Sequence, residues 1–517
     1  MTMHHPYTQT MLQAMGLLKQ EIKTINQPIA LELDDIFFEA IMLIQTAIKN
    51  NQKIFVAGDY DADGICSTTI LVRLFRQMGA EVGYYIPDRI KEGYGLNLDI
   101  ATSVVNKGYD CIVMVDNGVG VHDVHAYLKA HDKTVIVIDH HTIEATPQVD
   151  CLIHPDVLSD DYDTLCGAGL SHCLAQAAGL DDDVTIQLAA VATIGDLMPL
   201  RKFNRQLVRQ GLLIINDHPM LHLSNLLKKQ VVDEEDIAFL VVPKLNAVGR
   251  LSDLANVNNV VAFLLNEDTS QVLSFIESLE QLNQTRKDML KQMLVIALEQ
   301  INGDAFNFIV DERFHEGIVG ILAGHIARST QKPTLVATIK GDTIKGSLRS
   351  EHIDVFALMN KHSDAIAHFG GHAKAAGIEV KKADFERFKS MILNDLKHNP
   401  PMIETKDILE LDHEIIDMTG IKEFESFRPF GMGFERPTIK LSHCRVIRRN
   451  HLPKHNLSKW ILQFPNAQVE AISFDEVDEV IQAAQYITCI GTLAYKPYNG
   501  YEKIVLRIEN IQASDSV

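Results

Sequence analysis

The chain has 517 residues, of which 46% are hydrophobic and 22% charged, a composition that is ordinary for a globular protein and forces no large disordered region. A chain of this length exceeds a single hydrophobic core, so we expect about two to four domains. The formal net charge of −20 argues against indiscriminate binding to nucleic acid, although it permits a locally basic channel.

The seven cysteines are scattered and include no Cys-x-x-Cys pair, so they predict reduced thiols, not a disulfide framework or a zinc site. The first residues lack the charged and apolar regions of a signal peptide, and no apolar run reaches the ~18 residues of a membrane span. We therefore expect a cytoplasmic protein.

Residues 1–50 are predicted to be helical, because apolar side chains recur there at helical spacing. From Lys53 onward, apolar segments with the length of strands alternate with segments of helical length. Strands are expected at 54–58, 81–86, 110–115, 134–138 and about 149–153. The alternation predicts an α/β fold with a doubly wound parallel sheet, in which ligands bind beyond the carboxyl ends of the strands.

Three carboxylates follow the first of these strands at every second residue: Asp59, Asp61 and Asp63. Crowded acids repel one another and cost stability unless a cation lies between them, so this stretch predicts a metal site. The same pattern matches the first half of an EF-hand loop. An EF-hand, however, needs a preceding helix and a Glu at loop position 12, which here is Ile70. A solvated acidic turn is the remaining alternative.

Two further strands also end in acidic residues, at Asp116 and at Asp139-His140-His141, and Asp196 follows the predicted helix 184–194. Asp61, Asp63, Asp116, His140 and Asp196 together suit a pair of divalent ions. Carboxylates mixed with imidazole favour Mn²⁺, with Mg²⁺ as the alternative, whereas zinc would usually recruit Cys or more His.

Ten segments resemble motifs of one protein family. VAGDYDADG (56–64), VDNG (115–118), DHH (139–141) and GDLMPL (195–200) resemble, in this order, the four motifs of the DHH phosphoesterase superfamily. Six others are similar to the RecJ family of single-strand-specific exonucleases: PDRIKEGYGLN (87–97), NAVGRL (246–251), HEGIVGILAGHIA (315–327), KGSLRS (345–350), GGHAKAAG (370–377) and PFGMG (429–433). The resemblance covers roughly residues 50–440.

The resemblance implies hydrolysis of a phosphodiester by two metal ions, with Asp116 as the candidate bridging ligand and His141 against the scissile phosphate. For His141, a core histidine that only makes hydrogen bonds is the alternative. The chain departs from the pyrophosphatase branch of the superfamily at Ala57, where that branch has a histidine, so Asp59 is a candidate substitute ligand. It also has Phe434-Glu435 where RecJ proteins commonly have Asn-Pro.

The resemblance also assigns the substrate site. Arg89, Arg250, Ser347 and Arg349 match residues that hold the 5′-terminal phosphate, and Gly370, Gly371 and His372 form a glycine loop that faces the substrate. Arginine suits this role because its planar fork binds phosphate bidentately. For each arginine taken alone, a surface salt bridge is the alternative.

The rest of the chain predicts four further regions beside the catalytic domain. We expect an N-terminal helical segment (1–50), a DHH catalytic domain (51–204), a helical connector (205–300), a second α/β lobe or DHHA1 substrate-binding domain (301–399), and a C-terminal β-barrel or OB-fold nucleic-acid-binding domain (400–517). The last contains basic residues interleaved with aromatic ones, which suits single-strand binding. The candidates there are Arg445, Arg448, Arg449, Lys454 and Trp460. A solvated basic face with core tyrosines is the alternative.

The predicted activity is a 5′-to-3′ exonuclease for single-stranded DNA, acting as a monomer in DNA repair and recombination. By resemblance, a single-strand-binding protein and a helicase are expected partners. Two rival functions remain: a DHH phosphodiesterase of short oligonucleotides or cyclic dinucleotides, and a non-catalytic scaffold that binds single strands. The basic C-terminal domain argues against the first, and the intact acidic cluster argues against the second.

Overall fold

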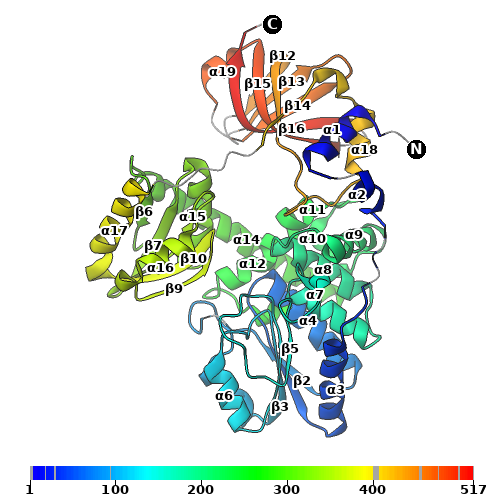
Figure 1. The fold of residues 1–517 in the computed structure, drawn as a ribbon, viewed down its shortest axis with the longest axis vertical. Coiled ribbons are helices and arrows are strands. Elements are labelled where there is room, and N and C mark those ends of the chain that lie inside the picture. Colours follow the sequence, from blue (N-terminus) through cyan, green and yellow to red (C-terminus); the bar gives the residue numbers. More distant parts are fainter. Residues whose placement is uncertain are drawn as a thin grey trace. The chain divides into compact units, whose positions relative to one another are not determined.

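The computed structural model describes residues 4–17, 19–27, 29, 31–93, 95–399, 407–452, 457–474, 477–498 and 501–515. The chain divides into two compact units (Figure 1). One, the barrel unit, comprises Met1–Leu31, Leu197–Arg209 and Thr405–Val517; the other, the two-lobed unit, comprises Glu32–Asp196 and Gln210–Glu404. Among the described residues, no helix combines the length and the apolar character needed to cross a membrane.

The first lobe of the two-lobed unit is built on a five-stranded sheet of order β2-β1-β3-β4-β5. Its strands are β1 (Lys53–Ala57), β2 (Val82–Tyr85), β3 (Tyr109–Val115), β4 (Thr134–Ile138) and β5 (Cys151–Ile153), and every neighbouring pair is parallel. The predicted doubly wound parallel sheet is therefore confirmed. The direction of winding changes between β1 and β3, which places the ligand crevice at the carboxyl ends of these strands.

Helices cover both faces of this sheet, as the continuous apolar strands require. They are α3 (Asp35–Lys49), α4 (Ala62–Gln77), α5 (Leu98–Asn106), α6 (His122–Ala130), α7 (Gly167–Ala177) and α8 (Asp183–Gly195). Phe55, Ile112 and Val135 face the apolar side of α5 and α6. The buried Asn117 side chain joins the ends of β1 and β3, because its amide donates to the carbonyls of Ala57 (3.1 Å) and Val115 (2.8 Å).

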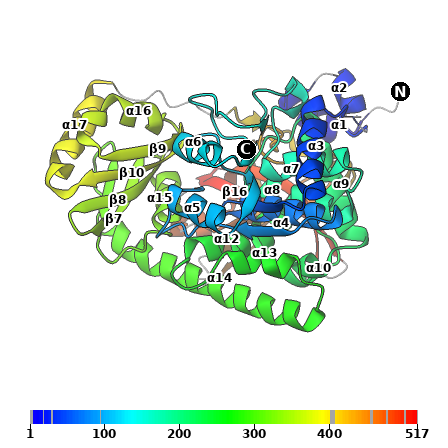
Figure 2. The same ribbon diagram turned by 90° about the horizontal axis from the view of Figure 1, so that it is seen from below.

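The predicted connector is helical. It contains α9 (Lys202–Asp217), α10 (Leu221–Leu227), α11 (Glu234–Asp236), a π-helical turn (Ile237–Val241), α12 (Val242–Arg250), α13 (Asn258–Leu264) and α14 (Thr269–Leu298). Helix α14 has 30 residues, which gives it a length of roughly 45 Å. Figure 2 shows it as one continuous helix that runs from α10 to the second sheet.

The second lobe has a mixed sheet of order β6-β7-β8-β10-β9. Its strands are β6 (Asn307–Val310), β7 (Thr334–Lys340), β8 (Thr343–Arg349), β9 (His368–His372) and β10 (Ala375–Lys381), and its helices are α15 (Val319–Thr330), α16 (Val355–Lys361) and α17 (Phe385–His398). Helix α15 packs on one face with residues of α14, and α16 and α17 pack on the other. On β8 and β10 this leaves Ser347, Arg349 and Gly377 on the α15 side.

In the barrel unit, β12 (Ile439–Leu452) pairs with both β13 (Leu457–Gln463) and β15 (Tyr486–Tyr498), and this double pairing closes the sheet. The remaining elements are α1 (Pro6–Ala14), α2 (Lys19–Thr24), β11 (Leu409–Glu410), α18 (Met418–Glu425), β14 (Gln468–Ser473), α19 (Glu479–Ala483) and β16 (Tyr501–Ser514). The predicted C-terminal β-barrel is confirmed.

Two segments far from the barrel in sequence belong to the same unit. Helix α1 packs on α18, and the Thr8 hydroxyl donates to the Gly420 carbonyl (3.0 Å). The Arg205 guanidinium lies 3.9 Å from the centre of the Phe434 ring and donates to the carbonyls of Phe427 and Pro429. The structure thus divides the predicted segment 1–50, since α3 belongs to the two-lobed unit.

Candidate active site

The carboxyl ends of β1, β3 and β4 bring the predicted ligands together. Potential ligand atoms lie within 4.8 Å of one another in three groups: Asp59–Asp61–Asp116, Asp63–His140–Asp196 and Asp116–His140–His141. Asp116 and His140 each belong to two groups. The grouping could hold two neighbouring cations, and the bridging role of Asp116 stays a prediction.

His140 lies at the centre of the cluster. Its Nε2 atom is 3.1 Å from Oδ1 of Asp116, 3.7 Å from Oδ2 of Asp63 and 3.6 Å from Oδ2 of Asp196. Burial lowers the pKa of this imidazole, which favours the neutral form that binds metal ions. Asp196, 56 residues further along the chain at the end of α8, is brought to the same point.

Two helix starts fix the carboxylates of Asp61 and Asp63. Asp61 caps α4, because its Oδ1 accepts hydrogen bonds from the backbone N–H groups of Asp63 (2.9 Å) and Gly64 (3.1 Å). Asp63 accepts two bonds from the start of α7, at 2.8 Å from Gly167 and 2.7 Å from Ala168. Each carboxylate is therefore held in one orientation by the backbone.

The cluster carries more negative charge than the protein compensates. Asp59 is 4% exposed, and its Oδ1 has no hydrogen-bond partner in the part of the chain that the structure describes. Burial, and then the charge of Asp61, raises its pKa well above the ordinary value. Burial and the neighbouring Asp63 and Asp61 likewise raise the pKa of Asp196 to about 8. A divalent cation would remove this penalty, and the carboxylate and imidazole donors fit Mn²⁺ or Mg²⁺.

Asp139 has a different role from its neighbours. Its Oδ1 accepts a hydrogen bond from the His140 backbone (2.8 Å) and lies 2.7 Å from Nδ1 of His141, and its Oδ2 accepts one from Val119 (3.1 Å). Burial would lower the pKa of His141, but Asp139 outweighs it and raises that pKa to about 9. Asp139 therefore fixes the loop that carries His140 and His141.

The predicted phosphate-binding arginines form a second group. The Arg89 guanidinium lies 4.8 Å from the centre of the Tyr60 ring, and Arg349 donates to the Ser347 hydroxyl (2.6 Å). Burial, and then the charge of Arg89, lowers the pKa of Arg250 to about 10. The pKa of Arg349 is lowered to about 10 for the same two reasons. Like charges gathered in this way are stabilised by an anion such as a phosphate.

Glycines bring the second lobe close to these groups. A Cβ on Gly317 would lie 1.8 Å from the Arg250 carbonyl oxygen, so only glycine permits this approach. Gly371 has φ +143, and a Cβ there would lie 2.3 Å from the Ala375 oxygen, whereas a Cβ on Gly370 would meet no atom within 4 Å. The predicted glycine loop is strand β9 of the β9–β10 hairpin, and the centres of the His372 and His141 rings are 6.4 Å apart, so this strand reaches the aspartate–histidine cluster.

Comparison with known proteins identifies the family. Family models match residues 53–195 (DHH family, N-terminal domain), 294–397 (DHHA1 domain) and 409–510 (RecJ OB domain). The single-stranded-DNA-specific exonuclease RecJ of Haemophilus influenzae is 30% identical over 464 residues, which are 80% of this chain and 80% of that protein. The chain belongs to the RecJ family.

Other RecJ proteins agree with this assignment. RecJ of Bacillus subtilis is 29% identical over 504 residues, but the match spans 92% of this chain and only 63% of that protein. The crystal structure of RecJ in complex with Mn²⁺ from Thermus thermophilus superposes with a TM-score of 0.85 at 25% identity, covering 99% of this chain and 77% of that one. A second structure of that RecJ contains Mg²⁺.

In the RecJ OB domain, the structure separates the predicted nucleic-acid-binding residues. Arg445 and Arg448 are exposed on β12, and their contact with nucleic acid stays a prediction. Arg449 donates to the carbonyls of Gln482, Ala483 and Ala484, so it holds the carboxyl end of α19. The prediction for Trp460 is wrong, because this side chain is 1% exposed in the barrel core and cannot stack on a base. Lys454 lies outside the described residues.

Sequence reasoning missed several residues that support this RecJ site. Gly167 and Ala168 hold Asp63, and the Asn246 side chain accepts a hydrogen bond from the Ala62 backbone at the start of α4 (2.7 Å). The two closely spaced glycines in Cys166-Gly-Ala-Gly169 were the sequence signal that could have indicated a close backbone approach there. The RecJ departure at Phe434-Glu435 also has a local explanation, since Glu435 accepts a bond from the Gly433 backbone (3.0 Å).

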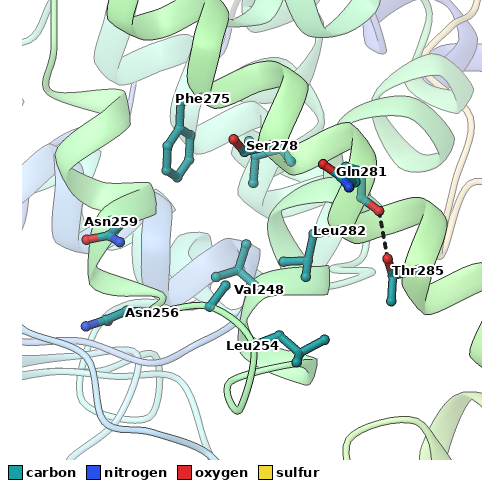
Figure 3. A pocket seen from close by; sticks show the side chains of 11 residues that line it. Val248, Leu254, Asn256, Asn259, Phe275, Ser278, Gln281, Leu282 and Thr285 are labelled. Carbon is teal, nitrogen blue, oxygen red and sulfur yellow. Dashed lines mark hydrogen bonds between the residues drawn. The ribbon is translucent and has the colours of Figure 1, made fainter.

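A separate cavity of about 490 Å³ lies between α14 and the segment that joins α12 and α13 (Figure 3). Phe275, Ser278 and Leu282 of α14 point into it, opposite Asn256 and Asn259. None of its lining side chains is ionisable, and none is a predicted site residue. The cavity therefore offers no group for phosphodiester hydrolysis.

Proposed function

We propose that this chain hydrolyses single-stranded DNA from the 5′ end to mononucleotides, using two divalent cations, in DNA repair and recombination. The proximity of the aspartate–histidine cluster to a group of arginines supports this most strongly. The RecJ relatives are single-stranded-DNA-specific exonucleases, which supports it as well.

The site residues divide the chemistry among themselves. Asp59, Asp61, Asp63, Asp116, His140 and Asp196 would hold the two ions, with Mn²⁺ favoured over Mg²⁺. When bound, such ions lower the pKa of a water molecule and stabilise charge on the attacking and leaving oxygens. His141, fixed by Asp139, would donate to the scissile phosphate and stabilise the charge that develops there.

The arginine group would select the end of the strand. Arg89, Arg250 and Arg349, with Ser347, would bind a terminal 5′-phosphate, since guanidinium groups bind phosphate through paired donors. The bare backbone at Gly370 leaves room for the first nucleotide beside His372. Arg445, Arg448 and Lys454 of the barrel would contact the phosphates of single-stranded DNA. A single-strand-binding protein and a helicase are the proposed partners.

Digestion of 5′-labelled, 5′-phosphorylated single-stranded DNA with Mn²⁺ tests this function. We expect labelled mononucleotides from the wild-type chain and from the exposed control variant Asp123→Ala, and none from Asp116→Ala or from duplex DNA. Cleavage confined to very short oligonucleotides would replace the proposal with a small-substrate phosphodiesterase. DNA binding without any cleavage would replace it with a non-catalytic scaffold.

A further inference from the structure

The first turn of α7 lies between two of the candidate metal ligands. The Gly167 N–H donates to Oδ2 of Asp63 (2.8 Å), and the Ala168 N–H donates to Oδ1 of the same carboxylate (2.7 Å). N–H groups in the first turn of a helix have no partner within the helix, and the positive end of the helix dipole attracts a carboxylate. Both oxygens of Asp63 are thus oriented by backbone that lies over 100 residues away in sequence.

Gly167 also makes a close approach to the other ligand. A Cβ placed on Gly167 would lie 2.9 Å from Cβ of Asp116, 3.2 Å from its Cα and 3.3 Å from its N. Asp116 has little freedom to retreat, because its backbone is in the left-handed region (φ 58) and its N–H is bonded to the Ile138 carbonyl (2.9 Å). All three residues are buried.

From this geometry we infer that Gly167 is a positioning residue for the metal pair, setting the separation of Asp63 and Asp116. A side chain here would push the start of α7 away from Asp116, and the same movement would withdraw both N–H donors from Asp63. Asp63 and Asp116 belong to different candidate ligand groups, so a change in their separation would disturb the binding of divalent cations there. This inference rests on the proposed metal-dependent function and adds a residue that binds no metal itself.

Gly169 offers a matched control on the same helix. It is also buried, but a Cβ there would meet Cδ2 of Leu165 at 3.2 Å, the far end of a flexible side chain. If the glycines of α7 served packing alone, Gly167→Ala and Gly169→Ala would have similar effects. If Gly167 positions the ligands, only its substitution affects metal binding.

Mn²⁺ binding to the full chain, followed by electron paramagnetic resonance of the free ion, tests the inference without reference to nuclease activity. We expect Gly167→Ala to weaken Mn²⁺ binding by about 10- to 100-fold, the usual effect of removing support from a metal ligand. Gly169→Ala should bind Mn²⁺ as the wild type does. Unchanged binding in Gly167→Ala, or equal weakening in both variants, would overturn the inference.

A second measurement remains decisive if Gly167→Ala does not fold. In the metal-free wild type, the N–H groups of Gly167 and Ala168 should exchange with solvent deuterium more slowly than in the folded variant Asp63→Ala, by about tenfold or more for a lost hydrogen bond of ~1.4 kcal/mol. Identical exchange in the two proteins would refute the role of these donors. Either measurement can fail while the exonuclease activity stands, so the two proposals are tested separately.

Discussion

Nδ1 of His141 lies 2.7 Å from Oδ1 of Asp139, and the same carboxylate binds the backbone of the loop that carries His140. Asp139 and His141, the first and third residues of the Asp139-His140-His141 motif, are therefore held in a fixed position relative to each other. Asp139 is fully buried at the end of β4, so it transmits the position of the strand to both imidazoles.

Asp139→Asn should reduce exonuclease turnover by about 10- to 100-fold, because an amide cannot hold the His141 imidazole as a carboxylate does. Asp150→Asn is the matched control, since Asp150 also accepts a backbone bond of β4, from Val135 (2.8 Å), but at the opposite end of the sheet. Turnover rates of both variants, measured on 5′-phosphorylated single strands, check this. Equal losses in the two variants would show that only the stability of the sheet matters.

Arg250→Lys should remove the preference for a 5′-phosphate. Lysine keeps the positive charge but loses the planar pair of donors, so we expect KM for 5′-phosphorylated DNA to rise about 10-fold or more, while KM for 5′-hydroxyl DNA changes little. The exposed Arg313, which pairs with Asp311, provides the control substitution Arg313→Lys. A parallel rise of KM on both substrates would mean that Arg250 does not read the terminal phosphate.

The two neighbouring glycines of β9 should respond in opposite ways to alanine. Gly371→Ala should destabilise the β9–β10 hairpin, because the backbone at φ +143 and the Ala375 oxygen at 2.3 Å both exclude a Cβ. Gly370→Ala should leave the stability unchanged and raise KM for DNA, since its Cβ would enter the space assigned to the substrate. Thermal unfolding and steady-state kinetics of the two variants distinguish these effects; an unchanged KM in Gly370→Ala would contradict the assignment.

Glu425→Gln should destabilise the barrel unit by about 3–5 kcal/mol, because it removes the buried negative charge that Arg436 and Arg428 each contact at 2.6 Å. Burial alone would raise the pKa of Glu425, but the two arginines outweigh burial and lower it. A lowered pKa contributes stability above the unfolded value near 4.5, and this contribution is lost as the pH falls below it. The difference in the free energy of unfolding between Glu425→Gln and the wild type should therefore be largest at pH 7 and shrink toward pH 3.

Urea unfolding followed by tryptophan fluorescence measures this difference selectively. The chain contains a single tryptophan, and Trp460 is buried in the barrel, so its emission reports on that unit alone. The exposed pair Lys53–Glu81, which belongs to the other unit, supplies the control Glu81→Gln. A difference that stays constant from pH 7 to pH 3 would argue against an ionised Glu425.

The site could be predicted from sequence wherever the signal was local. Buried apolar strands that end in acidic residues placed Asp61, Asp116 and His140 at one sheet edge, because parallel strands share that edge. The bonds from Gly167 and Ala168 to Asp63 join residues over 100 positions apart, and no local pattern encodes such a contact. Likewise, nothing within residues 1–50 indicates that α1 and α3 belong to different units.

The error at Trp460 has a physical cause that the sequence did contain. On β13, Ser458, Trp460 and Leu462 alternate with Lys459, Ile461 and Gln463, which is the period of a strand with one buried face. Because Trp460 shares its face with Leu462, it points into the barrel. Composition suggested an aromatic surface, whereas alternation would have assigned this side chain to the core.

The barrel unit is assembled from three separated stretches of chain, and this affects the order of its biosynthesis. Helix α1 is translated before the two-lobed unit, yet its buried residues Tyr7, Met11 and Leu12 pack in a unit whose longest stretch, Thr405–Val517, follows the two-lobed unit in sequence. The two-lobed unit can fold before α1 finds its partners, because none of its residues lies beyond Glu404. A truncated chain that ends there would leave α1 and residues 197–209 with uncovered apolar surface, and so would be prone to aggregate.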